Sequence, residues 1–138
     1  MRKGRVLSVD YGLKNVGLAC CDELGVTVHP LASIPNRGHR DLLSRLRSAV
    51  REHHVSHIVV GMPLNMDGSA GEAARRVERF IQLVRTELGM PSTAVDERLS
   101  TVEASEMWRE MSPRQQRRYR TVDSLAAAFI LERFLTES

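Results

Sequence analysis

Residues 10–19 read DYGLKNVGLA, and this stretch joins two short apolar runs near the start of the chain. The run before it, RVLSVD at residues 5–10, ends in an aspartate, and the run after it contains VGLACC at residues 16–21. Short apolar runs separated by a glycine-containing turn are typical of neighbouring β-strands. The stretch therefore predicts a pair of strands joined by a turn, with a carboxylate left where the first strand ends.

Strand and helix patterns alternate through the rest of the chain. VTVHPLASI (26–34) extends the first two strands into a three-stranded meander, and HIVVG (57–61) is a continuous apolar run typical of a buried parallel strand. STAVDER (92–98) predicts a fifth strand. Apolar residues at helical spacing predict helices over about 38–54, 70–88, 100–111 and 122–135, and Thr121 is a candidate N-cap of the last one.

The order of these elements, β-β-β-α-β-α-β-α-α, predicts an α/β fold. Parallel strands need crossover connections, and a meander followed by βαβ units therefore implies a mixed five-stranded sheet flanked by helices. We found no repeat or linker, and a length of 138 residues suits one domain spanning 1–138.

The composition favours a soluble, cytoplasmic protein and excludes a membrane-spanning one. The chain is 42% hydrophobic and 27% charged, and its apolar runs fall far short of the roughly 20 residues that cross a bilayer. The basic start of the chain has no long apolar core, so we expect no signal peptide. Cys20 and Cys21 are expected to be reduced thiols in the core.

Basic side chains gather between residues 109 and 120, where one acid, Glu110, accompanies five arginines: Arg109, Arg114, Arg117, Arg118 and Arg120. Such a cluster could neutralise several phosphates of a nucleic acid. A solvated loop and helix end explains the same residues equally well.

Asp10 is the first candidate site residue. Strand alternation puts it on the same face as Val6 and Ser8, at the carboxyl end of its strand, where open α/β sheets bind ligands. Gly12 permits a close approach of the backbone, and the charge of Lys14 suits a phosphate. An aspartate that only opens a turn is the competing interpretation.

Two more acids are candidates for the same place. Asp96 and Glu97 end the fifth strand, and alternation alone does not choose between them; an ion pair with Arg98 is the simpler explanation. Asp123 lies in the first turn of the last helix, where a carboxylate is favoured by the helix dipole even without a binding role. Its helical position, on the edge of the apolar face, points it toward the sheet.

Acids from the first strand, the fifth strand and the last helix would meet at one end of the sheet. They could not all ionise there without divalent cations. Hard oxygen ligands with open positions suit Mg²⁺ or Mn²⁺, and two such ions could clamp the attacking water and the leaving oxygen of a phosphodiester. The residues thus predict a metal-dependent nuclease.

Four stretches in this order and spacing make the chain resemble the YqgF (RuvX) family of Holliday-junction-resolvase-like proteins: DYGLKNVGLA, IVVGMPLNMDG, VDERLST and VDSLAAAFIL. The resemblance implies a ribonuclease H-like fold and a nuclease that matures the 5′ end of pre-16S ribosomal RNA in the cytoplasm. It puts the catalytic and metal-binding acids at Asp10, Glu97 and Asp123, and so favours Glu97 over Asp96. Related resolvases carry an acid where this chain has Gly61 to Pro63.

Substrate contacts are expected around these acids. The loop after the fourth strand offers Asn65 and Asp67 to substrate, although a plain connector is the alternative. Where the family usually has lysine then arginine, this chain has Lys14 then Asn15, which removes one phosphate-directed charge. The full set of expected substrate-binding residues is Lys14, Asn65, Asp67, Arg98, Arg117, Arg118 and Arg120.

Other functions stay open on the sequence alone. The expected partner is structured RNA, with branched DNA as the enzymatic rival, and a homodimer is compatible with both. A nucleic-acid or ribosome-binding protein without chemistry is the second class. An ATP-binding domain of the actin and sugar-kinase type is the third, although one such domain alone would lack its usual second half.

Overall fold

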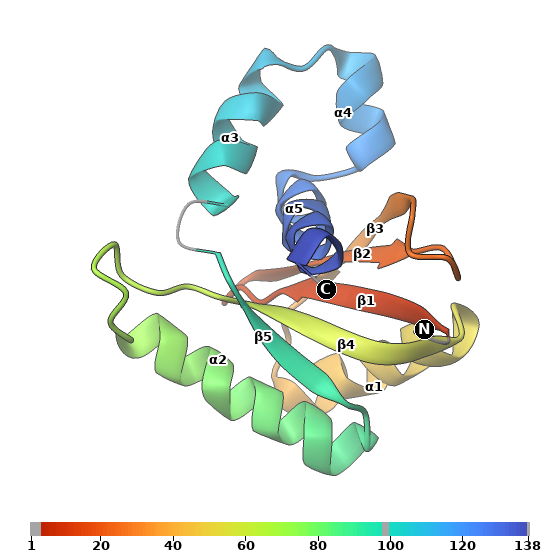
Figure 1. Ribbon diagram of the computed structural model, residues 1–138, viewed down its shortest axis with the longest axis vertical. Helices are drawn as coiled ribbons and strands as arrows, with labels where there is room; N and C mark the ends of the chain where they lie inside the picture. Colours follow the sequence, from red (N-terminus) through yellow and green to blue (C-terminus); the bar gives the residue numbers. More distant parts are fainter. Residues whose placement is uncertain (1–3, 98–99, 138) are drawn as a thin grey trace.

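One five-stranded sheet with helices on both faces makes up the computed structural model, which describes residues 4–97 and 100–137 (Figure 1). The strands are β1 (Arg5–Asp10), β2 (Asn15–Cys21), β3 (Val28–Pro35), β4 (Val55–Met62) and β5 (Ser92–Asp96). They lie in the order β3-β2-β1-β4-β5. β2 is antiparallel to β1 and β3, whereas β4 is parallel to β1 and β5. The predicted mixed sheet is confirmed.

The two faces of the sheet carry different helices (Figure 1). On one face lie α1 (His39–Glu52) and α2 (Glu72–Leu83), which continues as the π-helical turn η1 (Val84–Leu88) and stops at the left-handed Gly89. α5 (Val122–Glu137) lies on the other face. Alternation along β1 decides which core each side chain joins: Leu7 and Val9 pack with α1 and α2, and Val6 packs with α5.

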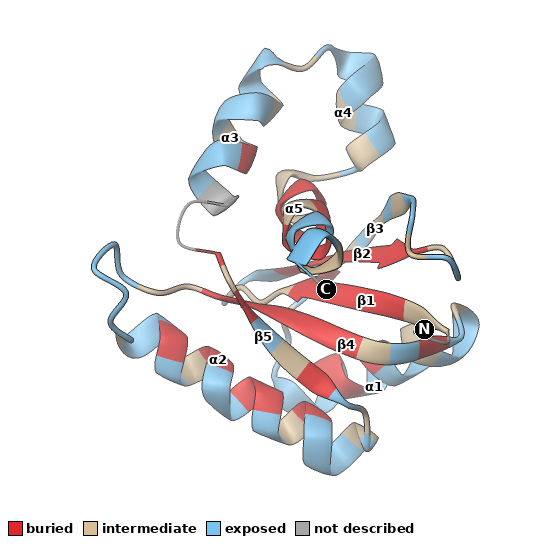
Figure 2. Cartoon of the chain, in the orientation of Figure 1, coloured by how far each residue is buried: buried red, intermediate tan, exposed pale blue. Residues whose placement is uncertain are grey.

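Two further helices, α3 (Ser100–Glu110) and α4 (Pro113–Tyr119), form an arm beyond α5. Figure 2 shows that this arm is largely exposed, with a small core of Ala104 and Trp108 against α5. Helix α4 was not predicted, because helices were expected in this part of the chain only over 100–111 and 122–135. Ser112 caps a new helix instead: its Oγ accepts from Gln115 N, and the Gln115 side chain accepts from Ser112 N.

The described helices include none that is both long and apolar enough to cross a bilayer. β5 ends at Asp96, one residue before the acid that the sequence placed inside the strand. This end of the sheet, where β1, β4 and β5 finish, is where the candidate site lies.

Candidate active site

Asp10 ends β1, the central strand of the sheet, and a glycine on each neighbouring strand leaves room beside it. Its Cα partner on β2 is Gly17. On β4 the parallel register pairs Val9 with Val60, so Gly61 follows next to Asp10. Without side chains at these two positions, other parts of the chain can approach the Asp10 carboxylate.

Glu97 enters the space above Gly61. It follows β5 directly, and its N–H donates to the Met62 carbonyl at 3.1 Å, which extends the β4–β5 pairing by one residue. A Cβ at Gly61 would lie only 2.5 Å from Glu97 Cδ and 2.7 Å from its Oε1. Glu97 is 5% exposed, and the missing side chain of Gly61 is what gives its carboxyl a place in the core.

Asp123 comes close on the other side, above Gly17. A Cβ on Gly17 would overlap the backbone carbonyl oxygen of Asp123, so only glycine allows α5 to start there. The predicted N-cap at Thr121 is confirmed, since its Oγ1 accepts from Ser124 N at 3.0 Å.

Serine hydroxyls fix this start of α5 against the sheet. Ser124 Oγ donates to the Leu31 carbonyl of β3 at 2.6 Å, and Ser33 Oγ lies 2.5 Å from Thr121 Oγ1. Ser8 Oγ, two residues before Asp10, donates to the Ala127 carbonyl of α5 at 2.6 Å. The first turn of α5, which carries Asp123, is therefore tied to β3, and the second turn is tied to β1.

Burial and mutual proximity raise the pKa of both Asp10 and Glu97. Burial, and then the nearby charge of Asp10, raises the pKa of Glu97 from 4.5 to about 9. Burial and the charge of Asp123 raise the pKa of Asp10 from 3.8 to about 6, although a hydrogen bond from Glu97 acts in the opposite direction. At neutral pH the protonated Glu97 thus donates to an ionised Asp10. Burial also raises the pKa of Asp123.

The three acids do not form a ready three-ligand metal site, although two of them, Asp10 and Glu97, suit a divalent cation. Within residues 4–97 and 100–137, no three acidic, histidine or cysteine side chains are grouped closely enough to hold a metal ion. Asp10 and Glu97 are in direct contact, whereas Asp123 is linked to Asp10 through its charge. Glu97 Oε2, however, is buried without a hydrogen-bond partner. Such an oxygen, held among hard carboxylate donors, suits a magnesium-like ion.

The expected substrate-binding residues lie in three places around this end of the sheet. Lys14 is exposed in the β1–β2 turn. In the loop after β4, Asn65 donates to Ser69 Oγ, and Asp67 accepts from the N–H and hydroxyl of Ser69, so both side chains hold the loop closed on itself. Arg98 lies outside the described residues.

The remaining expected contacts are the arginines of the arm. Arg117 and Arg118 are exposed on α4, and the Arg118 guanidinium lies 6.0 Å from the centre of the Tyr119 ring. Arg120 is exposed at the junction of α4 and α5, three residues before Asp123.

Sequence reasoning missed the roles of Gly17, Gly61 and the serines that position the acids. A glycine inside an apolar strand run is a signal for a close backbone approach, and both glycines are inside such runs. The signal does not say what approaches. That depends on the register of the sheet and on the helix above it.

Comparison with known proteins connects this geometry to a family. The model of the RuvX family, described as Holliday junction resolvase, matches residues 4–137. A Lachnospira eligens protein is 39% identical over 134 residues, covering 95% of this chain and 96% of its own length. A Clostridioides difficile protein is 36% identical over 135 residues, covering 98% of this chain and 96% of its own length. Both are named "Putative pre-16S rRNA nuclease".

Solved structures share the fold at low sequence identity. The fowlpox virus Holliday junction resolvase has a TM-score of 0.59 at 14% identity, covering 97% of this chain and 99% of its own. Thermus thermophilus RuvC in complex with a Holliday junction substrate has a TM-score of 0.50 at 14% identity, covering 97% of this chain and 95% of its own. The expected ribonuclease H-like fold is confirmed.

Proposed function

The chain belongs to the RuvX family, and from this premise we propose that it is a cytoplasmic, divalent-metal-dependent nuclease that cleaves structured precursor ribosomal RNA. Membership supports action on nucleic acid, because the curated relatives carry a pre-16S rRNA nuclease name and a similar fold has been solved with Holliday junction DNA. The proposal applies equally to a monomer and to a homodimer.

Asp10, Glu97 and Asp123 are the residues that would hold Mg²⁺ or Mn²⁺. Bound there, such ions, two by our expectation, would activate a water molecule and stabilise the charge that develops on a phosphodiester. The protein contributes the positions of the oxygens: β1 fixes Asp10, the β5 end fixes Glu97, and the capped first turn of α5 fixes Asp123. The proton held by Glu97 must leave before its carboxylate can serve as a ligand.

The observation that carries the proposal is the buried Glu97 carboxyl. One oxygen has no hydrogen-bond partner, and the carboxyl lies against the Asp10 carboxylate in a hollow left by Gly61. Burying two acids together costs stability unless something of opposite charge binds them. A structural role alone would be served better by an apolar side chain at residue 97.

Basic residues outside the carboxylates would bind the phosphates of the substrate. Lys14 is exposed in the turn that follows Asp10. Arg117, Arg118 and Arg120 are exposed on the arm and at its junction with α5. Phosphate contacts of this kind position a nucleic acid without reading its sequence.

Cleavage of a labelled precursor of 16S RNA in the presence of Mg²⁺ tests the proposal. We expect Asp10→Asn and Glu97→Gln to lower the cleavage rate by at least about 100-fold, since a loss of several kcal/mol of metal-assisted stabilisation corresponds to such a factor. Glu78→Gln removes an exposed acid of α2 and serves as the matched control. Equal cleavage by Asp10→Asn, or undiminished cleavage in excess chelator, would refute the assignment.

A DNA junction resolvase is the second candidate function, favoured by the description of the family model and by the fowlpox resolvase fold. A four-way DNA junction cut faster than the RNA, with the same loss in Asp10→Asn, would identify this activity. If neither substrate is cut while RNA binding survives Asp10→Asn, the chain is a binding protein without chemistry.

A further inference from the structure

A groove that the proposed active site does not use lies between α1 and the edge strand β3. Its volume is about 490 Å³, within the roughly 300–1,000 Å³ of small-ligand sites. Leu18, Leu31 and Ile34 line it and belong to the core under α1, on the face of the sheet opposite α5. The groove is therefore distinct from the site around Asp10.

Arg120 lines the groove from the junction of α4 and α5, and its backbone is held in a rare conformation. It has φ 70° and ψ −63°, and Thr121 N donates to the Tyr119 carbonyl at 2.8 Å. These are the features of a classical γ-turn, which is strained for any residue with a side chain. Strain of this kind persists where the surroundings impose it and is concentrated at binding sites.

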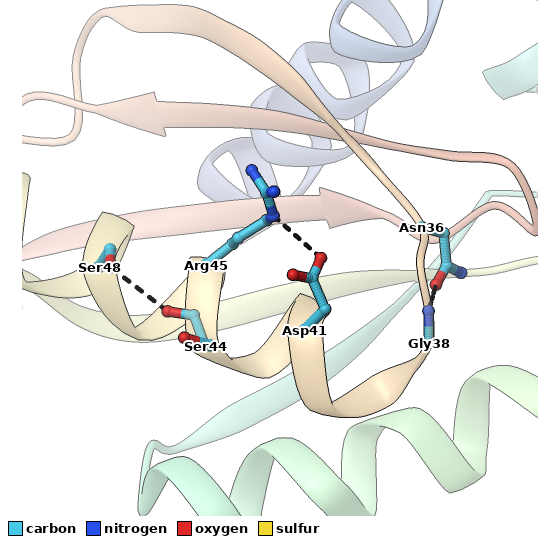
Figure 3. A network of polar contacts seen from close by, with 6 residues as sticks. All are labelled: Asn36, Gly38, Asp41, Ser44, Arg45 and Ser48. Atoms are coloured by element: carbon cyan, nitrogen blue, oxygen red, sulfur yellow. Dashed lines mark hydrogen bonds and ion pairs between the residues drawn. The ribbon is translucent and has the colours of Figure 1, made fainter.

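Arg45 supplies a second guanidinium on the α1 side of the groove. Its Nε donates to Asp41 Oδ2 at 2.9 Å, which orients the side chain as Figure 3 shows. No hydrogen bond within the described residues uses its two terminal nitrogens, so these donors are left for a ligand. Ser48, one turn further along α1, also lines the groove, and its Oγ donates to the Ser44 carbonyl at 3.3 Å (Figure 3).

A peptide strand is a poor occupant for this groove. β3 is an edge strand and contains Pro30 and Pro35, which have no N–H to pair with an added strand. Prolines on an edge discourage strand addition. Two arginines and one acid, Glu52, line the groove together with apolar side chains. The excess of positive charge favours a ligand with one anionic group and one flat apolar part.

We propose that this groove holds one nucleotide of a single-stranded nucleic acid, with the base against Leu31 and Ala32, above the buried Leu18 and Ile34, and a phosphate bound by Arg120 and Arg45. This inference rests on the proposed function, because it adds a subsite for the same strand. Arg120 is three residues before Asp123, and the segment between them contacts β3 through Thr121 and Ser33. A strand that crosses the edge of β3 would thus reach both the groove and the carboxylates.

Methyl NMR spectra of the full chain test the subsite directly. The probes are adenosine 5′-monophosphate, adenosine, and a ten-residue single-stranded oligoadenylate. We expect the monophosphate to shift the methyl signals of Leu18, Leu31 and Ile34, and adenosine to bind at least 10-fold more weakly because it lacks the phosphate. The oligonucleotide should shift the same signals and bind at least 10-fold more tightly than the monophosphate.

Arg120→Gly is the informative variant, because glycine accepts positive φ without strain. We expect it to unfold at the same temperature as the wild type or higher, and yet to bind the monophosphate and the oligonucleotide at least 10-fold more weakly. Arg79→Ala removes an exposed arginine of α2 and should leave both affinities unchanged. Equal affinities in the wild type and in Arg120→Gly would overturn the subsite.

Two other results would also overturn it. Millimolar monophosphate without methyl shifts would show that the groove is no nucleotide site, and monophosphate binding that the oligonucleotide cannot displace would assign it to a free nucleotide. Asp10→Asn separates this inference from the nuclease proposal: we expect the monophosphate, which occupies the groove alone, to shift the same methyl signals in this variant as in the wild type. Loss of cleavage with intact methyl shifts supports both proposals, whereas intact cleavage with intact shifts refutes only the nuclease residues.

Discussion

The two faces of the sheet are packed in different ways. The face under α1 and α2 is filled by large side chains, among them Phe80, Leu42 and Leu46, all fully buried. The face under α5 has small side chains near the site, with Ala127 and Ala128 on the helix and Gly17 and Ala19 on β2, and larger ones such as Ile130 and Leu131 further along α5. Large side chains hold a helix away from a sheet, whereas small ones let its backbone approach. Only the second arrangement brings a helix carboxylate close to the end of a central strand.

Truncation on the large-side-chain face should have the greatest effect on stability. Phe80→Ala removes a fully buried ring that stacks on Tyr11 at 4.6 Å between centroids. We expect a loss of about 4 kcal/mol in the free energy of unfolding, since aromatic-to-alanine changes leave large cavities. Urea denaturation measures it, with the exposed Arg79→Ala as control. A loss below about 2 kcal/mol would mean that this face is not the main source of stability.

Replacing a glycine by alanine on the small-side-chain face should cause the next largest loss in the free energy of unfolding. Gly17→Ala puts a Cβ onto the Asp123 carbonyl, which is backbone and cannot yield cheaply, so we expect a loss of about 3 kcal/mol. Gly61→Ala meets the ends of the Glu97 and Ile130 side chains, and we expect about half as much, about 1.5 kcal/mol. Denaturation of both variants gives the comparison, and the reverse order would contradict the backbone contact.

Glu97 should have a smaller effect on the free energy of unfolding, and this effect should depend on pH. Its pKa is raised in the folded protein from 4.5 to about 9, so its stabilising contribution is complete below pH 4.5 and is lost as pH rises through 9. Without divalent ions the free energy of unfolding should therefore fall from pH 5 to pH 9 by more in the wild type than in Glu97→Gln.

Thermal unfolding across this pH range measures the difference. Millimolar Mn²⁺ should raise the melting temperature of the wild type most at high pH, where the proton that competes with the ion has left. Parallel curves for the wild type and Glu97→Gln without metal would show that Glu97 carries no shifted pKa.

The smallest expected effect is at the link between β1 and α5. Ser8→Ala removes the hydrogen bond from Ser8 Oγ to the Ala127 carbonyl, and we expect a loss of about 1 kcal/mol in the free energy of unfolding. Cleavage should fall as well if this bond helps to hold α5 and Asp123 in place. Val6→Ala, on the same strand and face, is the control for lost packing alone, and it should reduce stability without a matching loss of cleavage at a temperature where both variants are folded.

Much of the fold could be predicted because its signals are local. Strand alternation put Val6 on the same face of its strand as Asp10, the face that the structure places under α5, and Thr121 was expected to cap the last helix. α4 was missed although Ser112, Pro113 and Gln115 form a recognisable helix start, because a Ser-Pro pair also ends helices. The error was to interpret Ser112 and Pro113 only as the end of one helix and not also as the start of the next.

The candidate site likewise has features that local sequence signals predict and features that depend on contacts between distant parts of the chain. The sequence by itself predicted acids at the ends of β1 and β5 and at the start of α5, since the spacing of apolar residues indicates where elements end, and the family resemblance favoured Glu97 over Asp96. Only the tertiary structure decided that Glu97 fills the hollow of Gly61, that α5 starts over Gly17, and that Arg120 reaches a groove at β3. Each of these contacts joins residues that are far apart in the sequence. The nearest pair, Gly61 and Glu97, is separated by 36 positions. Contacts of this range depend on how the sheet and helices pack, which no short stretch of chain specifies.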